Sequence, residues 1–452
     1  MRMFEADKIS GAEASNFAMS AVLGVFEKYQ ETARFKYPFY GLTVDTATGR
    51  MTEWIRRDQY AEVTQHILDT VQREGLGYFS TIRKDSVGAV GSFLDHVREF
   101  TPTLSQLTDD ELLDAYDHAS EEYCTKYALG LVTFLYEEII SERLSAALSA
   151  RYTDATERIS SLLSTRYKSF IVESEEALQQ VQKATDNERQ KYIDAYIRDF
   201  FYMRATYLRC EHITPEMVVE MASHTESHPQ KDIGGIETEL TDEERAIVDV
   251  LRETEIIRDL RKKLATIGNY MMFEFVREAV RRTKLSQDIV TRIFWNEYAK
   301  LMRDPTSMAE VLQKRIITSA VLEADRTYYL EYNAFVDRAA SEADTGEVRG
   351  TPASGGTVRG RACVILGTSD FGKFQRGDIL IAEMTRPEFV PVMRLASAFV
   401  TDEGGLTCHA AVIAREMRKP CIVGTRRGTS TFKDGDLVEV DANRGIVRIA
   451  KG

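Results

Sequence analysis

The spacing of apolar residues divides this chain into a long helical part and a shorter part of mixed character. Before about residue 340, apolar residues recur at intervals of three and four, as in Leu112-Leu113-Tyr116 and Leu129-Leu131-Val132-Leu135. This spacing puts apolar side chains on one face of a helix. Glycine and proline are sparse in these segments, and we find no repeat of fixed period. The pattern predicts a mostly α-helical N-terminal region.

Helix starts and breaks subdivide that region. Thr108-Asp109-Asp110-Glu111 and Thr241-Asp242-Glu243-Glu244 place a threonine before acidic residues, a combination that starts helices. The stretch 222–235 is polar and rich in helix breakers, which predicts a linker or a surface loop. A second break at 340–347 predicts a swivel hinge. We therefore expect three parts, namely helical regions at 1–225 and 236–340 and a separate domain at 350–452.

The last part changes character. Short apolar runs rich in β-branched residues alternate with glycine and aspartate turns, a pattern that predicts strands. The runs are Cys363–Leu366, Leu437–Val440 and Ile446–Ile449. A helical segment lies among them, so we expect a small α/β domain. The predicted fold class is thus multidomain, a mostly α-helical region followed by a C-terminal α/β domain.

Composition narrows the function classes. The formal net charge of −13 argues against a general nucleic-acid surface, because phosphate backbones need a basic face. No run of about 18 apolar residues occurs and the first residues lack a signal-peptide core, so we expect neither a membrane span nor secretion. The five cysteines are scattered and never spaced as CxxC, which favours reduced thiols in the cytoplasm and offers no zinc site.

One histidine stands where a strand and a turn lead into a helix. Ala398–Val400 is a short apolar run, and Gly404-Gly405 permit a tight turn. Thr407 is a suitable helix N-cap, which places His409 in the first turn of a helix that ends before Pro420. Free N–H groups and the helix dipole favour a phosphoryl group there, and a neutral imidazole is a nucleophile. From position alone, a buried or capping histidine is the more common explanation.

A family resemblance favours the phosphoryl interpretation. From about Gly350 to Val447 the chain resembles the mobile phosphohistidine domain of phosphoenolpyruvate-utilising enzymes, which include phosphoenolpyruvate synthase, pyruvate phosphate dikinase and rifampin phosphotransferase. The matching blocks are 350–356, 360–362, 377–382, 384–387, 391–393, the stretch 400–416 around His409, 420–425, 434–436 and 440–441. So many ordered matches predict a swivelling phosphohistidine domain.

The resemblance assigns roles within the histidine block. It implies that His409 becomes phosphorylated and that Thr407 binds the phosphoryl group or orients the ring. Gly404 and Gly405 would let the backbone approach that group. Cys408 is shared with the synthase-type motif, and a small packing residue is its simplest role.

The chain departs from the family pattern at three places. Gly355 stands where the family often has proline. Residues 386–389 stand where the family often has an Asp-Pro-Asp-Trp loop near the histidine. At the C-terminal end of the helix, residues 417–419 are more basic than the family's usual Leu-Gly-Ile. Arg415 lies nearly two helical turns beyond the histidine, too far for an expected phosphate contact. None of these changes touches His409 itself.

Donor chemistry is missing from the sequence. Neither GxGxxG nor GxxxxGK[ST] occurs, and the helical part leaves no room for the family's ATP-grasp domain. The barrel that binds phosphoenolpyruvate or pyruvate in the synthase is missing too. A carrier separate from its ATP-binding chain resembles phenylphosphate synthase, so we expect no cofactor on this chain alone and ATP with Mg²⁺ through an ATP-grasp partner.

Weaker likenesses concern the acceptor. Segments 107–144 and 240–301 are similar to helical regions that precede the carrier in rifampin-phosphotransferase-like proteins, where such a region holds the acceptor. By that likeness 236–340 would hold a small acceptor, with Arg258 and Arg261 as candidate substrate-binding residues. Together with Lys262 and Lys263, these residues could steer a phosphate or an acidic partner, although such charges more commonly form a solvated helix face.

Two other clusters have simpler explanations. His224 and His228 lie four apart, but their polar, proline-containing surroundings disfavour a metal-binding helix, and we expect no metal site. An aromatic cluster could line a pocket, although core packing explains it better. Its members are Phe35, Tyr37, Phe39, Tyr40 and Trp54.

The sequence therefore predicts the carrier and acceptor-binding component of a split, dikinase-like phosphotransferase in the cytoplasm. The alternative is a phosphohistidine relay or regulatory binding protein without acceptor chemistry. A scaffold that has lost its donor is a third option, and the complete histidine block argues against it. The acceptor, the donor and the oligomeric state stay open.

Overall fold

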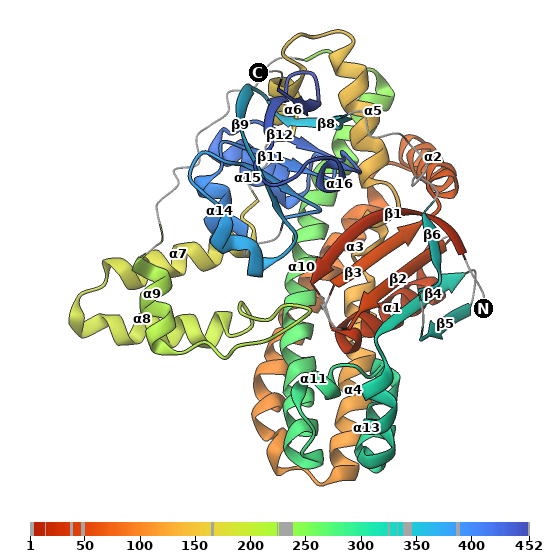
Figure 1. The fold of residues 1–452 in the computed structure, drawn as a ribbon, viewed down its shortest axis with the longest axis vertical. Helices are drawn as coiled ribbons and strands as arrows, with labels where there is room; N and C mark the ends of the chain where they lie inside the picture. Colours follow the sequence, from red (N-terminus) through yellow and green to blue (C-terminus); the bar gives the residue numbers. More distant parts are fainter. Residues whose placement is uncertain are drawn as a thin grey trace.

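The computed structural model describes residues 4–13, 15–36, 39–46, 50–163, 167–223, 225, 238–323, 326–331, 333–337, 346–385 and 389–450. Two sheets lie on a helical scaffold whose axis is α10 (Asp242–Thr283), the long green helix at the centre of Figure 1. The sheet of the C-terminal domain lies at one end of α10, and the other sheet lies beside its middle (Figure 1).

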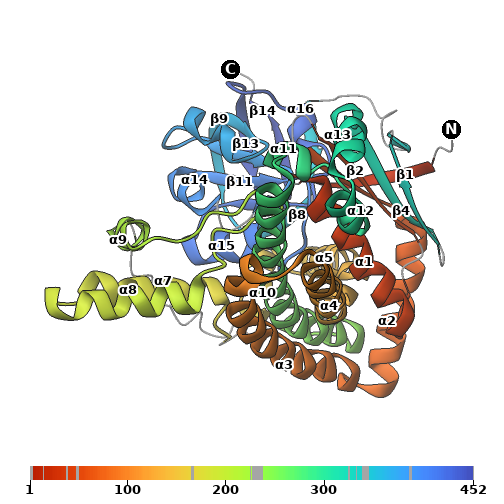
Figure 2. The same ribbon diagram turned by 90° about the horizontal axis from the view of Figure 1, so that it is seen from below.

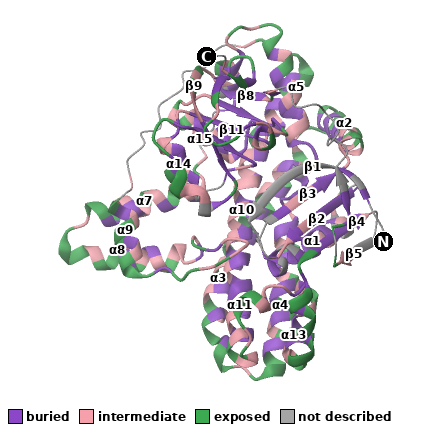
Figure 3. Cartoon of the chain, in the orientation of Figure 1, coloured by how far each residue is buried: buried purple, intermediate pink, exposed green. Residues whose placement is uncertain are grey.

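The central helix follows from its sequence. Thr241 caps it in a reciprocal capping box with Glu244, and acidic residues fill its first turn. Arginines occupy the last turn, and Lys284 ends the helix in the left-handed conformation at φ 63°. Among the helices that pack along α10 are three that help to bury many of its residues (Figure 3). They are α3 (Gly77–Phe100), α4 (Asp109–Ala128) and α5 (Glu137–Ser149).

A six-stranded sheet in the N-terminal part was not predicted. Its order is β5-β4-β2-β3-β1-β6, and it joins strands from both predicted helical regions. Phe335 packs over Gly41, where an added Cβ would lie 2.2 Å from the ring, and stacks on Trp54. The strands are β1 (Phe4–Glu13), β2 (Phe39–Asp45), β3 (Arg50–Ile55), β4 (Ile317–Glu323), β5 (Arg326–Leu330) and β6 (Phe335–Asp337).

The C-terminal domain is the predicted α/β unit. Its eight-stranded sheet has the order β7-β14-β13-β9-β10-β11-β12-β8, and strands β9 to β12 pair in parallel. The strands are β7 (Glu347–Arg349), β8 (Thr351–Ser354), β9 (Thr357–Ile365), β10 (Ile379–Ala382), β11 (Ala398–Thr401), β12 (Cys421–Val423), β13 (Leu437–Asp441) and β14 (Ile446–Ile449). Its helices are α14 (Val390–Leu395), α15 (His409–Met417) and α16 (Gly428–Thr431).

The remaining helices cover the sheets or extend from them. Helices α7 to α9 form an arm that projects from the body in both ribbon views (Figures 1 and 2) and has a small apolar cluster of its own, including Leu178 and Tyr196. These helices are α1 (Asn16–Thr32), α2 (Arg57–Glu74), α6 (Ala155–Leu162), α7 (Phe170–Lys183), α8 (Asp186–Phe200), α9 (Pro215–Ser223), α11 (Gln287–Val290), α12 (Tyr298–Arg303) and α13 (Pro305–Lys314).

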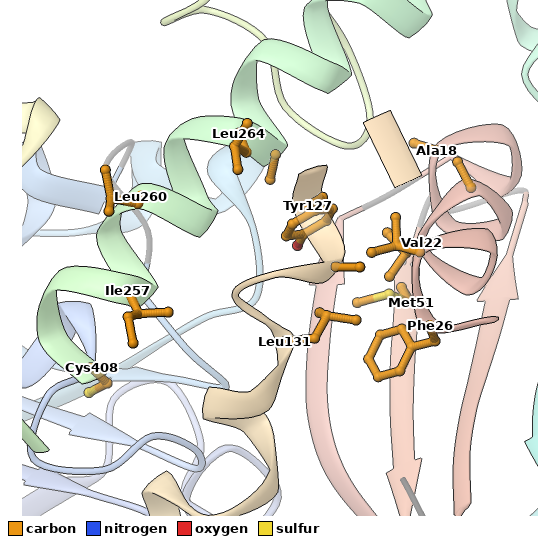
Figure 4. Packing of buried hydrophobic residues seen from close by; sticks show 14 of the residues in the cluster. Ala18, Val22, Phe26, Met51, Tyr127, Leu131, Ile257, Leu260, Leu264 and Cys408 are labelled. Carbon is orange, nitrogen blue, oxygen red and sulfur yellow. The ribbon is translucent and has the colours of Figure 1, made fainter. Parts of the chain in front are cut away.

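One continuous apolar cluster joins the C-terminal domain to the helical scaffold. Figure 4 shows Cys408 of that domain beside Ile257 of α10, and further residues of the same cluster reach Phe26 of α1. The two parts are therefore docked through buried apolar surface, which stabilises their contact.

Several local predictions can be compared with the structure. The aromatic cluster is core, as expected, since Phe39 and Tyr40 are buried; Tyr37 lies outside the described residues. Residues 131–135 form a 3₁₀ turn rather than the expected α-helix. The predicted linker and hinge fall largely on 224, 226–237 and 338–345, which lie outside the described residues, as do His224 and His228. Along the described part of the chain, no helix has the length and apolar character needed to cross a bilayer.

Candidate functional site

His409 and Thr385 meet because they follow neighbouring parallel strands. Thr385 comes after β10 and His409 opens the helix after β11, and the carboxyl ends of parallel strands lie at one edge of a sheet. The Thr385 Oγ1 and His409 Nδ1 atoms are 2.8 Å apart, within hydrogen-bond distance. Thr385 thereby fixes the orientation of the ring.

The helix cap lies one residue later than the sequence predicts. Cys408, and not Thr407, is the N-cap of α15, and its Sγ accepts a hydrogen bond from the Ala411 N–H at 3.4 Å. Gly404 has φ +99°, and a Cβ there would lie 2.7 Å from the Cys408 sulfur. The glycine turn therefore makes room for the cap, and His409 is the first residue of the helix, in the first turn as predicted.

The two ring nitrogens of His409 have different surroundings. Nδ1 faces Thr385, whereas Nε2 is buried and has no hydrogen-bond partner among the described residues. Burial lowers the pKa of His409 well below 6.5, and the nearby Lys262 and Arg258 lower it further. The ring is therefore neutral at pH 7. If its proton is on Nδ1 and donated to Thr385, the Nε2 lone pair is free to act as a nucleophile.

Two basic residues of α10, Arg258 and Lys262, lie near the histidine. Arg258 is largely buried and its Nε has no hydrogen-bond partner in the described part of the chain. Burial, with Arg258 and Arg261 nearby, lowers the pKa of Lys262 to about 7. An anion on Nε2 would lie near the Arg258 guanidinium and would favour the protonated form of Lys262.

Helix α5 holds the loop that leads to the histidine. Thr407 Oγ1 donates to Glu137 Oε1, and Arg258 Nη1 donates to the same oxygen. One turn on, Ser141 Oγ accepts from the Leu406 N–H at 3.1 Å. Gly405 lies against this face, where an added Cβ would be 2.5 Å from Ser141 Oγ. The first turns of α5 therefore form a receptor for residues 405–407.

Two ion pairs extend the contact between the domain and the scaffold. Arg426 pairs with Glu142 at 3.1 Å, and Arg394 lies 3.9 Å from Glu175 on the arm. Both pairs are partly exposed, so they add specificity more than stability.

Other sequence-predicted residues lie away from the ring. Arg261 is 6% exposed and packs on Gly130, where a Cβ would be 2.6 Å from its own Cβ. Arg415 Nη1 donates to the Leu406 carbonyl at 2.7 Å, so it supports the loop. The expected solvated face on α10 is wrong for Arg258 and Arg261, because α5 and the segment before it cover that face. Residues 386–388 lie outside the described part.

Sequence reasoning did not select Thr385, Glu137 or Ser141, and it named Lys262 only as a member of a basic cluster. Thr385 stands inside one of the blocks that carry the family resemblance, so a closer reading could have selected it. Glu137, Ser141 and Lys262 carry no motif, and only the docking of two distant segments brings them to the histidine. Within the described residues, no group of three or more His, Cys, Asp and Glu side chains could hold a metal ion.

Comparison with known proteins relates this site to a family. Residues 374–445 match the family described as the PEP-utilising enzyme, mobile domain. Phosphoenolpyruvate synthase of Aeropyrum pernix is 52% identical over 101 residues, which are 22% of this chain and 12% of that protein. Phosphoenolpyruvate synthase of Pyrococcus furiosus is 47% identical over 110 residues, or 24% and 14% of the two chains.

A probable phosphoenolpyruvate synthase of Methanothermobacter thermautotrophicus is 47% identical over 100 residues, covering 22% of this chain and 15% of that protein. The chain therefore spans only 12–15% of the length of these curated relatives. Residues 374–445, which match the family, lie in the domain that holds His409.

Proposed function

Since its residues 374–445 belong to the phosphoenolpyruvate-utilising mobile domain family, we propose that this chain carries a phosphoryl group on His409 and delivers it to a small acceptor. The observation that supports the proposal is the buried Nε2 atom of His409, which has no hydrogen-bond partner among the described residues, in a ring whose pKa the nearby Lys262 and Arg258 lower. We call residues 346–450 the carrier domain from here on.

Loading is a displacement at phosphorus. The Nε2 lone pair forms a P–N bond while the donor's P–O bond breaks, and the donor oxygen leaves with the bonding electrons. The ring gains positive charge in this step. Thr385 stabilises that charge by accepting the Nδ1–H hydrogen bond across 2.8 Å.

The donor must reach Nε2 from outside the docked arrangement. In this structure the scaffold covers Nε2, so loading requires the carrier domain to leave α5 and α10. The predicted hinge at 340–350 is where the chain would swing. A separate ATP-grasp chain with ATP and Mg²⁺ is the proposed donor, in line with the resemblance to phenylphosphate synthase.

Delivery takes place after the loaded carrier domain has docked again. Arg258 and Lys262 would neutralise charge on the phosphoryl group while an acceptor oxygen attacks phosphorus and the P–N bond breaks. The acceptor's proton leaves to solvent or base, and Nε2 recovers its lone pair. Separate loading and delivery positions keep the two reactions apart.

Phosphorylation with labelled ATP tests this function. The purified chain is incubated with γ- or β-labelled ATP, with and without candidate ATP-grasp chains, and acid-labile, base-stable label is counted. We expect label that depends on the partner and is lost in His409→Ala. The labelled position then distinguishes β- from γ-phosphoryl transfer.

Two results would argue against the proposal. Equal labelling of His409→Ala would exclude His409 as the carrier. Normal loading followed by transfer only to a protein, and to no small molecule, would favour the relay alternative.

A further inference from the structure

The carboxylate of Glu137 stands where the charge of a phosphoryl group is needed. We propose that Glu137 is a positioning residue which, in the unphosphorylated chain, occupies the hydrogen-bond donors that the phosphoryl group on His409 takes over. Loading then displaces Glu137, and docking of the carrier domain depends on phosphorylation. This inference rests on the function proposed above.

The first step is the convergence of donors on one oxygen. Thr407 Oγ1 on the carrier domain and Arg258 Nη1 on α10 both donate to Glu137 Oε1. Glu137 is only 9% exposed, so this contact is made largely out of water. Charged hydrogen bonds in such a place are strong, and their partners are not easily replaced by solvent.

The second observation is that both donors lie near the histidine. Thr407 precedes His409 by two residues, and Arg258 is among the charges that lower the pKa of His409. Arg258 also has a buried Nε without a partner in the described residues, so the carboxylate leaves part of the guanidinium unused. A phosphoryl group on Nε2 would take over the two donors that Glu137 uses, Thr407 Oγ1 and Arg258 Nη1, and would gain Arg258 Nε as a third.

The phosphoryl group and the Glu137 carboxylate are both anions. A phosphoryl group carries about −1.5 to −2 charges near pH 7. A carboxylate beside it repels it, while one arginine and one lysine cannot neutralise both anions fully. Because the phosphoryl group is bonded to Nε2, Glu137 is the group that turns away. The loss of its bond to Thr407 loosens the carrier domain.

Contacts that do not involve Glu137 survive this exchange. Whenever the loaded carrier domain is docked, Leu406 donates to Ser141 and Arg426 pairs with Glu142, but the docked arrangement is populated for a smaller fraction of the time. The carrier domain therefore loosens from α5 without losing its orientation. Glu137 thereby sets how strongly loading weakens docking.

The test uses a small phosphoryl donor, so that no partner is needed. Phosphoramidate loads histidine when Nε2 attacks phosphorus and ammonia leaves. Hydrogen exchange at the Leu406 amide reports docking, because this amide donates to Ser141 only in the docked arrangement. Exchange is measured before and after loading in wild type, Glu137→Gln and Glu142→Gln, each checked for an unchanged melting temperature.

We expect loading to speed exchange at Leu406 in wild type. In Glu137→Gln the increase in rate on loading should be about tenfold smaller, the order expected for one charged hydrogen bond. Glutamine keeps the size of the side chain and its acceptor oxygen but removes the charge. Glu142→Gln is the matched control, because it weakens docking through Arg426 equally in the loaded and unloaded chain.

The outcomes separate the two proposals. If His409 is phosphorylated and loading speeds exchange at Leu406 equally in all three proteins, the role of Glu137 alone is overturned. If His409 is phosphorylated in none of them, the proposed function is overturned, and this inference with it.

Discussion

At the scale of single residues, the site depends on how the two nitrogens of His409 are distinguished. Thr385 faces Nδ1 at 2.8 Å, and Nε2 is left for chemistry. A histidine whose proton is held on one nitrogen presents a fixed lone pair on the other. Thr385 was not predicted from the sequence, because a threonine in a loop has many ordinary roles. Only the register of the parallel strands β10 and β11 brings it to the ring.

Replacing Thr385 tests this arrangement. Thr385→Val keeps the shape of the side chain but removes the hydroxyl, so we expect phosphoramidate to load His409 about tenfold more slowly, the order expected for one hydrogen bond. Thr385→Ser should load at close to the wild-type rate. Equal rates for valine and threonine would mean that the ring needs no such anchor.

At the scale of elements, α10 supplies the charge of the site and α5 its receptor. Capping and periodicity predicted α10 correctly, because Thr241, Glu244 and the apolar spacing are local signals. The N-terminal sheet was missed for the opposite reason. Strands β2 and β4 pair across more than 250 residues of chain, and β3 contains charged and polar residues that a local pattern does not assign to a strand.

The lowered pKa of Lys262 gives α10 a pH dependence. Docking buries Lys262 and lowers its pKa from 10.5 to about 7, so the docked state prefers the neutral amine. Between these values the undocked chain binds a proton that the docked chain does not, and docking weakens as the pH falls. Relative to Lys262→Met, docking of the unloaded wild type should therefore strengthen from pH 7 to 9.5.

Hydrogen exchange at Leu406, compared between the two proteins at each pH, measures this difference. The comparison cancels the contributions of other titrating groups, among them Glu403, whose pKa is raised by burial and by Glu53, Glu383 and Glu138. A ratio that does not change with pH would show that Lys262 keeps the same charge whether or not the carrier domain is docked.

At the scale of the whole molecule, the proposed function requires the carrier domain to occupy two positions, one for loading and one for delivery. The C-terminal fold and the place of its histidine were predictable, since turns, caps and ordered blocks lie within about 100 residues. The docked interface was not predictable. Glu137, Ser141 and Arg258 meet 405–409 only through tertiary contacts, which leave no periodic trace in the sequence.

Gly405 offers a way to disturb docking alone. In Gly405→Ala the new methyl group would lie 2.5 Å from Ser141 Oγ and 3.1 Å from the backbone carbonyl oxygen of Glu137. This oxygen belongs to the backbone of α5 and cannot move aside as a flexible side chain can. We expect docking to weaken by about 1–3 kcal/mol, the usual cost of overpacking. Exchange at the α5 amides should rise, and phosphoramidate should load His409 faster because Nε2 is exposed more often.

Gly372→Ala is the control for that variant, because it lies in the same domain and its added Cβ meets nothing within 4 Å. It should behave as wild type in both measurements. Slower loading of Gly405→Ala would indicate that the docked arrangement, and not the free carrier domain, accepts the phosphoryl group.

The most direct test of the central claim is the phosphorus NMR spectrum of the loaded chain, recorded for wild type and His409→Ala. The two phosphohistidine isomers have different chemical shifts, so the spectrum identifies the bonded nitrogen. We expect a single Nε2-phosphohistidine signal in wild type that is absent from His409→Ala. A signal from the Nδ1 isomer, or one that survives the substitution, would contradict it.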